Sequence, residues 1–135
     1  MLLSDFGMSS LIPSWINPPK IKSTYKKNLN MMYIGGEIVK QDERYIVRDN
    51  PFGNNLVLSS TQLFGFKETT GHKHEGQEEV YLFLDGIGEM QLDNEIFPIK
   101  TGDVIPIKDG VFHKVYNRSA DDLFFICIFD GARTK

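Results

Sequence analysis

The chain has 135 residues, of which 41% are hydrophobic and 24% charged, and its formal net charge at pH 7 is −3. A chain of this size and composition suits one globular domain with a single core. The charges are interspersed without a basic stripe, no apolar run approaches the roughly 20 residues of a membrane span, and the one cysteine, Cys127, cannot form an internal disulfide. We therefore expect no nucleic-acid or membrane partner, and, because the N-terminus lacks the features of a signal peptide, a cytoplasmic protein.

Residues 1–30 differ in composition from the rest of the chain. They contain three prolines and a cluster of four lysines. This composition predicts an irregular N-terminal arm and not a second domain. The apolar residues of the arm, Trp15 among them, are expected to pack on the main domain or on a neighbouring subunit. A single domain is expected over residues 31–135.

From Tyr33 onward, short runs with β-strand character alternate with turn signals made of Gly, Asn and Asp. The runs span residues 33–39, 44–48, 55–66, 79–85, 87–92, 95–99, 103–107, 112–117 and 123–129. The stretch 50–55 and the dipeptide Asp93-Asn94 are among the turns, and the second suits a hairpin because both residues tolerate positive φ. Many short strands without a helix of convincing length predict an all-β sandwich or barrel.

The run 79–85 is largely apolar on both of its faces, and so is the run 123–129. A strand with one solvated face would alternate polar and apolar residues, so something must cover both faces of these strands. We expect the barrel interior on one side, and another sheet, the arm or a second subunit on the other. A homodimer is therefore our working hypothesis.

The three histidines of the chain and one glutamate form a candidate metal site. His72 and His74 stand two residues apart and would point the same way on a strand, so that both can donate a nitrogen to one ion. Glu79 opens an apolar strand, where a carboxylate is costly to bury unless a cation neutralises it. His113 supplies a third nitrogen if its segment converges with the others. Two further glutamates compete for the carboxylate position, Glu75 and Glu78.

Two segments resemble the paired motifs of the cupin superfamily. Residues 72–86 are similar to the first motif, which is His-x-His followed by Glu and then Gly, and residues 102–117 are similar to the second. The sequence departs from the motifs at two turn positions, where Phe66 and Lys108 replace the usual Gly and Pro. The resemblance implies an all-β, double-stranded β-helix (jelly-roll) barrel in which four residues bind the metal: His72, His74, Glu79 and His113.

A site with three imidazoles and one carboxylate, and with open positions for water or substrate, suits one divalent transition metal ion: Fe, Mn, Ni, Co, Cu or Zn. The lack of a thiolate ligand argues against a structural zinc site. Such an ion could act as a Lewis acid, bind dioxygen beside a chelating substrate, or hold a ligand without chemistry. The expected partner is a small polar molecule.

The residues around the first motif are also similar to the cupin-type glucose-6-phosphate isomerases. In that family the positions that match Thr69, Gly71 and Tyr81 hold the sugar phosphate. The resemblance implies sugar or sugar-phosphate isomerisation as the leading function, with Glu79 moving the proton and Tyr81 adding a hydroxyl. Cupin dioxygenase or lyase chemistry is one alternative, and non-catalytic binding of a metal or small ligand is another.

Inward-facing residues should line a cavity beside the metal. Tyr81 and Phe83 belong to this set and are candidate substrate contacts. The sequence does not decide which side chains of the strand 87–92 face inward, because the glycines near its start permit a bulge. If Glu89 and Gln91 face inward, the cavity suits a polar substrate. If Met90 and Leu92 face inward, it suits an apolar one. Further expected lining residues are Val115, Phe125 and Phe129.

Two other side chains are assigned from their surroundings. Cys127 lies in an apolar run and is expected in the core. Lys108 lies beside the loop that carries His113, where it is either solvated or within reach of an anionic substrate.

Overall fold

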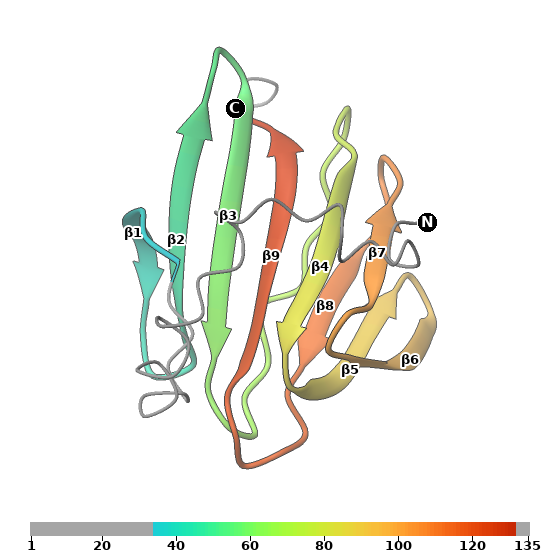
Figure 1. The fold of residues 1–135 in the computed structure, drawn as a ribbon. Helices are drawn as coiled ribbons and strands as arrows, with labels where there is room; N and C mark the ends of the chain where they lie inside the picture. Colours follow the sequence, from blue (N-terminus) through green and yellow to red (C-terminus); the bar gives the residue numbers. More distant parts are fainter. Residues whose placement is uncertain (1–33, 132–135) are drawn as a thin grey trace, which may run out of the picture. The chain divides into compact units, whose positions relative to one another are not determined.

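The computed structural model describes residues 34–131 (Figure 1), so the arm expected over residues 1–30 lies outside the described residues. Within the described range there are nine strands and no helix, which confirms the all-β prediction. No part of this range therefore forms a helix that could cross a membrane. The strands are β1 (Glu37–Gln41), β2 (Tyr45–Phe52), β3 (Leu56–Leu63), β4 (Glu79–Asp85), β5 (Ile87–Leu92), β6 (Glu95–Lys100), β7 (Val104–Ile107), β8 (His113–Tyr116) and β9 (Leu123–Asp130).

The strands form two antiparallel sheets. Six strands lie side by side in the order β1-β2-β3-β9-β4-β7, and three form a smaller sheet in the order β6-β5-β8 (Figure 1). Both sheets contribute side chains with 0% exposure to the core, which therefore lies between them. These side chains are Leu63, Phe83 and Leu123 from the larger sheet and Met90 from the smaller one.

The register of the larger sheet sets two rows of side chains on its inner face, because directly paired residues point to the same side. One row runs across β2, β3, β9 and β4 through Val47, Thr61, Phe125 and Phe83. The next row runs across the same strands through Asp49, Ser59, Cys127 and Tyr81. Polar residues thus gather at the β2 and β3 side of this face, and aromatic residues at the β9 and β4 side.

The turn predicted over residues 50–55 is shorter than expected. β2 continues to Phe52, with Pro51 paired to Val57, and the turn is confined to residues 53–55, where Gly53 has a φ of 55°. The pairing of β1 with β2 reaches only to Asp49, so β2 has a free edge at Pro51. Proline is tolerated in a strand at such an edge, because it has no N–H to donate.

The hairpin turn predicted at Asp93-Asn94 is confirmed. It joins β5 to β6, and Asp93 has a φ of 54°. The Asp93 N–H donates to the Phe112 carbonyl at 2.8 Å, and the Asp93 carboxylate accepts from the Phe112 N–H at 3.0 Å. This turn therefore holds the residue that directly precedes His113.

Candidate metal centre

The segment that carries His72 and His74 is not a regular strand. It pairs with β8 through two isolated bridges, Glu68 with Tyr116 and His72 with His113; in the second, the His72 N–H donates to the His113 carbonyl at 3.2 Å and the His113 N–H donates to the His72 carbonyl at 2.9 Å. The ring centroids of His72 and His74 nevertheless lie 4.6 Å apart, and those of His72 and His113 lie 4.5 Å apart. The three imidazoles predicted to converge do so.

Gly71 allows this segment to lie close to β8. A Cβ atom at this position would overlap the ring of Phe112. Any larger residue would therefore have to displace the ring of Phe112, the residue directly before His113. Gly71 has a packing role here and does not line the cavity described below.

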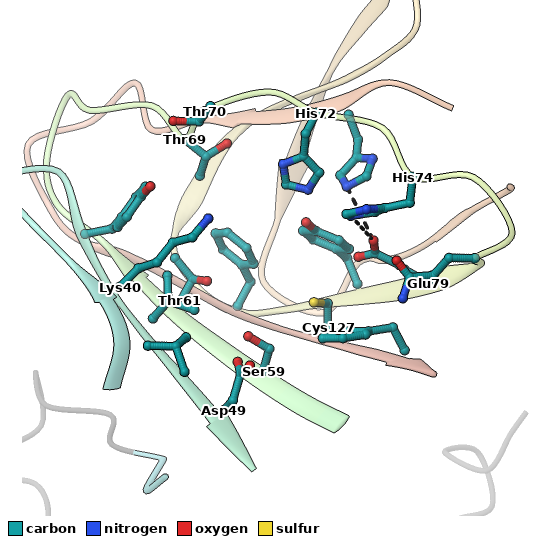
Figure 2. A pocket seen from close by; sticks show the side chains of 18 residues that line it. Lys40, Asp49, Ser59, Thr61, Thr69, Thr70, His72, His74, Glu79 and Cys127 are labelled. Atoms are coloured by element: carbon teal, nitrogen blue, oxygen red, sulfur yellow. Dashed lines mark ion pairs between the residues drawn. The ribbon is translucent and has the colours of Figure 1, made fainter. Parts of the chain in front are cut away.

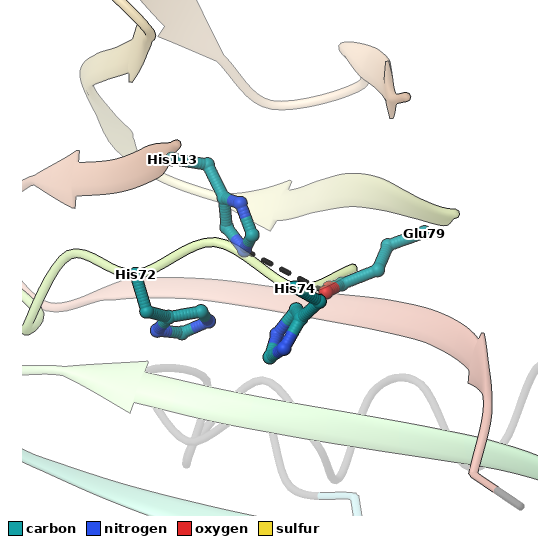
Figure 3. A group of neighbouring side chains, drawn as sticks. All are labelled: His72, His74, Glu79 and His113. Carbon is teal, nitrogen blue, oxygen red and sulfur yellow. Dashed lines mark ion pairs between the residues drawn. The ribbon is translucent and has the colours of Figure 1, made fainter. Parts of the chain in front are cut away.

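Glu79 completes the group from the first position of β4 (Figure 3). Its Oε2 atom lies 3.2 Å from His74 Nε2 and 3.6 Å from His113 Nε2. One ligand atom from each of the four residues lies within 4.8 Å of all the others. The competing glutamates Glu75 and Glu78 are exposed and stand outside this group.

The state of His113 indicates that the group suits a cation. Its Nδ1 lies 3.0 Å from the Val111 carbonyl oxygen, which can only accept a hydrogen bond, so the proton belongs on Nδ1. Nε2 then presents a lone pair to the Glu79 carboxylate, and this buried atom has no hydrogen-bond partner. A buried nitrogen without a partner is costly, and two facing lone pairs repel. A divalent transition metal ion between them would accept a lone pair from the His113 nitrogen and one from the Glu79 carboxylate, since imidazole and carboxylate are its usual ligands.

The protonation of His72 is also suited to a metal ligand. Burial, followed by the neighbouring His113 and His74, lowers the pKa of His72 to about 4. The ring is therefore neutral near pH 7 and can offer a nitrogen lone pair.

A cavity of about 240 Å³ opens beside the four residues (Figure 2). The histidines and Glu79 form one wall, which we call the ligand wall. The opposite wall comes from β1, β2 and β3, and we call it the far wall; its polar members are Lys40, Asp49, Ser59 and Thr61. Tyr81, Phe125, Cys127 and Phe129 lie between the two walls.

Two of the expected substrate contacts line this cavity, Thr69 and Tyr81. Thr69 is engaged with β8, because its Oγ1 accepts from the Val115 N–H at 3.0 Å and its own N–H donates to the Val115 carbonyl at 2.9 Å. Tyr81 stacks on Phe125 with 5.4 Å between ring centroids. Burial, followed by the neighbouring Cys127 and Glu79, raises the pKa of Tyr81 well above 10, so its hydroxyl stays protonated.

Other expected lining residues lie in the core. Phe83 is 0% exposed and Val115 is 1% exposed, and neither borders the cavity.

On β5 the inward face carries Met90, which is 0% exposed. The outward residues are engaged elsewhere: Glu89 pairs with Arg118 at 3.0 Å, and Gln91 accepts from the Tyr116 hydroxyl at 2.6 Å. The question left open by the sequence is thus settled in favour of the Met90 face, although that face packs in the core and not against the cavity.

Cys127 packs against the core, as expected, and it also lines the cavity beside Glu79 (Figure 2). Burial and then the Glu79 carboxylate raise the pKa of its thiol well above 9.

Lys108 does not line this cavity; it borders a separate depression beside Asp93. The residues of the far wall were missed by the sequence analysis, and the alternation of Ser59, Thr61 and Leu63 was the one signal of a partly polar inner face.

Comparison with known proteins finds similarity to cupins over part of the chain. A family model described as Cupin domain matches residues 65–129. The matched range contains both segments that resemble the cupin motifs. An uncharacterized protein of Methanocaldococcus jannaschii is 43% identical over 60 residues, which cover 44% of this chain and 48% of the relative. The oxalate-binding protein of Thermotoga maritima is 39% identical over 57 residues, which cover 42% of this chain and 47% of the relative. The chain thus matches about half the length of these curated relatives.

Solved structures show the same fold. A cupin-2 domain from Rhodospirillum rubrum has a TM-score of 0.67 at 16% identity, with 78% of this chain and 77% of that chain covered. A predicted oxalate decarboxylase from Thermotoga maritima has a TM-score of 0.61 at 24% identity, with 71% and 88% covered. A Bacillus subtilis oxalate decarboxylase studied for its Mn(II) centres has a TM-score of 0.64 at 17% identity, with 73% and 28% covered. The predicted double-stranded β-helix is confirmed.

Proposed function

We propose that this chain, which has the cupin fold, binds one divalent transition metal ion through His72, His74, Glu79 and His113 and holds a small carboxylate in the adjoining cavity. The observation that carries the proposal is the buried Nε2 atom of His113, which has no hydrogen-bond partner and faces a carboxylate. When bound, the metal would supply a Lewis acid and an electrostatic anchor for an anionic oxygen.

The size of the cavity and one relative support a carboxylate ligand. A volume of about 240 Å³ lies below the roughly 300–1,000 Å³ of pockets for drug-sized molecules. A relative with 39% identity over the matched region, the Thermotoga maritima protein, is named for oxalate binding. Because that match covers about half of each chain, the ligand class is carried over to this protein only as part of the proposal.

Any proton transfer in this cavity would fall to a few groups. The chain has three histidines, and all of them belong to the proposed ligand set. Tyr81, whose pKa is raised, is a hydrogen-bond donor and not a base at neutral pH. Glu79 is the nearest carboxylate, and its position between His74 and His113 suits it to balance the charge of the ion first and to move a proton second.

Sugar-phosphate isomerisation, the leading expectation from the sequence, ranks below carboxylate binding. The comparisons give no support to a similarity with the isomerases. The Thr69 N–H and Oγ1 are both engaged with Val115, and Gly71 serves the packing against Phe112. Among the remaining alternatives, a lyase that cleaves a carboxylate and a non-catalytic carboxylate-binding protein agree best with the proposed ligand.

One experiment tests the proposal. Protein purified without added metal is analysed for its elements, and oxalate is titrated calorimetrically into metal-loaded and chelator-treated samples. We expect about one metal ion per chain and oxalate binding that disappears on chelation. Substoichiometric metal even after reconstitution, or oxalate binding that survives chelation, would overturn the proposal. Parallel assays of carbon dioxide release and of fructose 6-phosphate turnover decide between binding, lyase and isomerase activity.

The homodimer and the cytoplasmic location stay predictions. The outer face of the larger sheet carries exposed apolar residues, including Leu56, Val104 and Ile128. A second subunit on this face is the arrangement that the prediction requires.

A further inference from the structure

The far wall of the cavity contains a feature that metal binding does not explain. Lys40 lies on β1, the edge strand of the larger sheet, and extends from it toward the interior of the cavity, on the side of Thr69 and His72 (Figure 2). It is the only lysine or arginine among the described residues that line the cavity. Lys40 is exposed on its strand, and it adds a positive charge to the lining of the cavity from the far wall.

A β-bulge directs Lys40 into the cavity. Glu37 pairs with Asp49, so a regular register would place Val39 opposite Val47 and turn Lys40 to the outside. The register instead shifts between Ile38 and Lys40, and Lys40 pairs with Val47, whose side chain faces inward. Bulges are frequent at sheet edges beside functional sites, where they re-aim a side chain.

Lys40 also differs from the paired cations of the surface. Arg44, Lys100, Lys114 and Arg118 each form an ion pair with a carboxylate, at 2.8 to 3.4 Å. The Lys40 side chain has no hydrogen bond or ion pair within the described part of the chain. An ammonium in this position is available to an anion in the cavity.

Two hydroxyl groups of β3 lie beside the position that such an anion would take. Thr61 is 8% exposed and lies in the same row as Lys40, beyond Val47. Ser59, which is 7% exposed, lies in the next row. Neither hydroxyl has a side-chain hydrogen bond within residues 34–131. Asp49 shares the row of Ser59 and would repel an anion there, so the favourable position is over Lys40 and Thr61.

We propose that Lys40 and Thr61 form a second anion-binding subsite, so that the preferred ligand is a dicarboxylate with one end at the ligand wall and the other at Lys40. This inference rests on the proposed function, which places the first carboxylate at the metal. It adds the residues that would hold the second carboxylate and so select a ligand with two anionic groups.

The test compares dicarboxylates with matched monoanions. Oxalate, malonate and succinate are titrated calorimetrically into metal-loaded protein, each beside its monomethyl ester, at constant ionic strength. We expect at least one diacid to bind about tenfold more tightly than its ester, the gain that one additional charge-assisted contact provides. Lys40→Met should remove this preference without changing the metal content, and Lys40→Arg should keep most of it. Thr61→Val should reduce it several-fold.

Lys108→Met is the matched control, because it removes an equal charge outside the cavity and should leave the preference intact. A diacid preference that persists in Lys40→Met, or the absence of such a preference while the esters bind, overturns the subsite and leaves the proposed function standing. The absence of all carboxylate binding overturns the proposed function and this inference together. Circular dichroism of each variant shows that a loss of binding is not a loss of fold.

Discussion

The two walls of the cavity differ in how the chain assembles them. The ligand wall comes from the first residue of β4 and from two segments that meet through isolated bridges, and its residues stand at the spacing of the two cupin motifs. The far wall comes from three paired strands and one bulge, and its residues are ordinary strand residues such as Lys40, Ser59 and Thr61. Two short motifs therefore supply the metal ligands, whereas the register of the sheet decides which side chains line the rest of the cavity.

The largest expected effect is a loss of metal affinity after a substitution in the ligand wall. His113→Ala removes a ligand whose Nε2 atom is buried and whose ring is oriented by the Val111 carbonyl. Changing a group that only orients a metal ligand lowers affinity about 10–100-fold, so loss of the ligand itself should lower it by at least about 100-fold. Competition with a fluorescent chelator measures the metal Kd.

Ser59→Ala is the control from the far wall. It removes a hydroxyl of the same cavity, and the metal Kd should not change. Equal losses of metal affinity in His113→Ala and Ser59→Ala would contradict the conclusion that only the ligand wall binds the metal. The thermal unfolding of both metal-free variants shows whether each remains folded.

The next effect concerns the packing that brings the ligand segments together. Gly71→Ala places a Cβ atom against the ring of Phe112, and the overlap should destabilise the metal-free protein by about 2 kcal/mol, within the usual range for overpacking. Urea denaturation measures the free energy of unfolding. In the double variant Gly71→Ala/Phe112→Leu, the smaller side chain should recover part of this loss, as a double-mutant cycle would show. Additive losses would mean that Phe112 is not the neighbour that requires glycine.

The comparison of the walls also explains what could be predicted from the sequence. Every predicted run corresponds to a strand, and β4 and β5 have the predicted bounds, because short runs of strand-forming residues between Gly, Asn or Asp turns are local signals. The convergence of His72, His74, Glu79 and His113 was expected from motif spacing. The inward direction of Lys40 could not be expected, because it depends on a one-residue shift in the pairing of β1 with β2. The sequence did not reveal that Cys127 borders the cavity, because a strand that is apolar on both faces does not show which face meets a cavity.

The smallest expected effect tests a residue that borders the cavity between the walls. Thr69→Val removes the oxygen that accepts a hydrogen bond from the Val115 N–H at 3.0 Å. Val115 is 1% exposed, so its N–H would lose its partner in a buried position, at a cost of about 1 kcal/mol in the free energy of unfolding. Thr69→Ser keeps the oxygen and should stay close to the original stability, and both variants should retain the metal Kd and the oxalate Kd. If Thr69→Val instead weakened ligand binding while leaving stability unchanged, Thr69 would be a ligand contact, as its resemblance to the isomerase motif implied. The far wall would then share anion binding with the segment that carries the histidines.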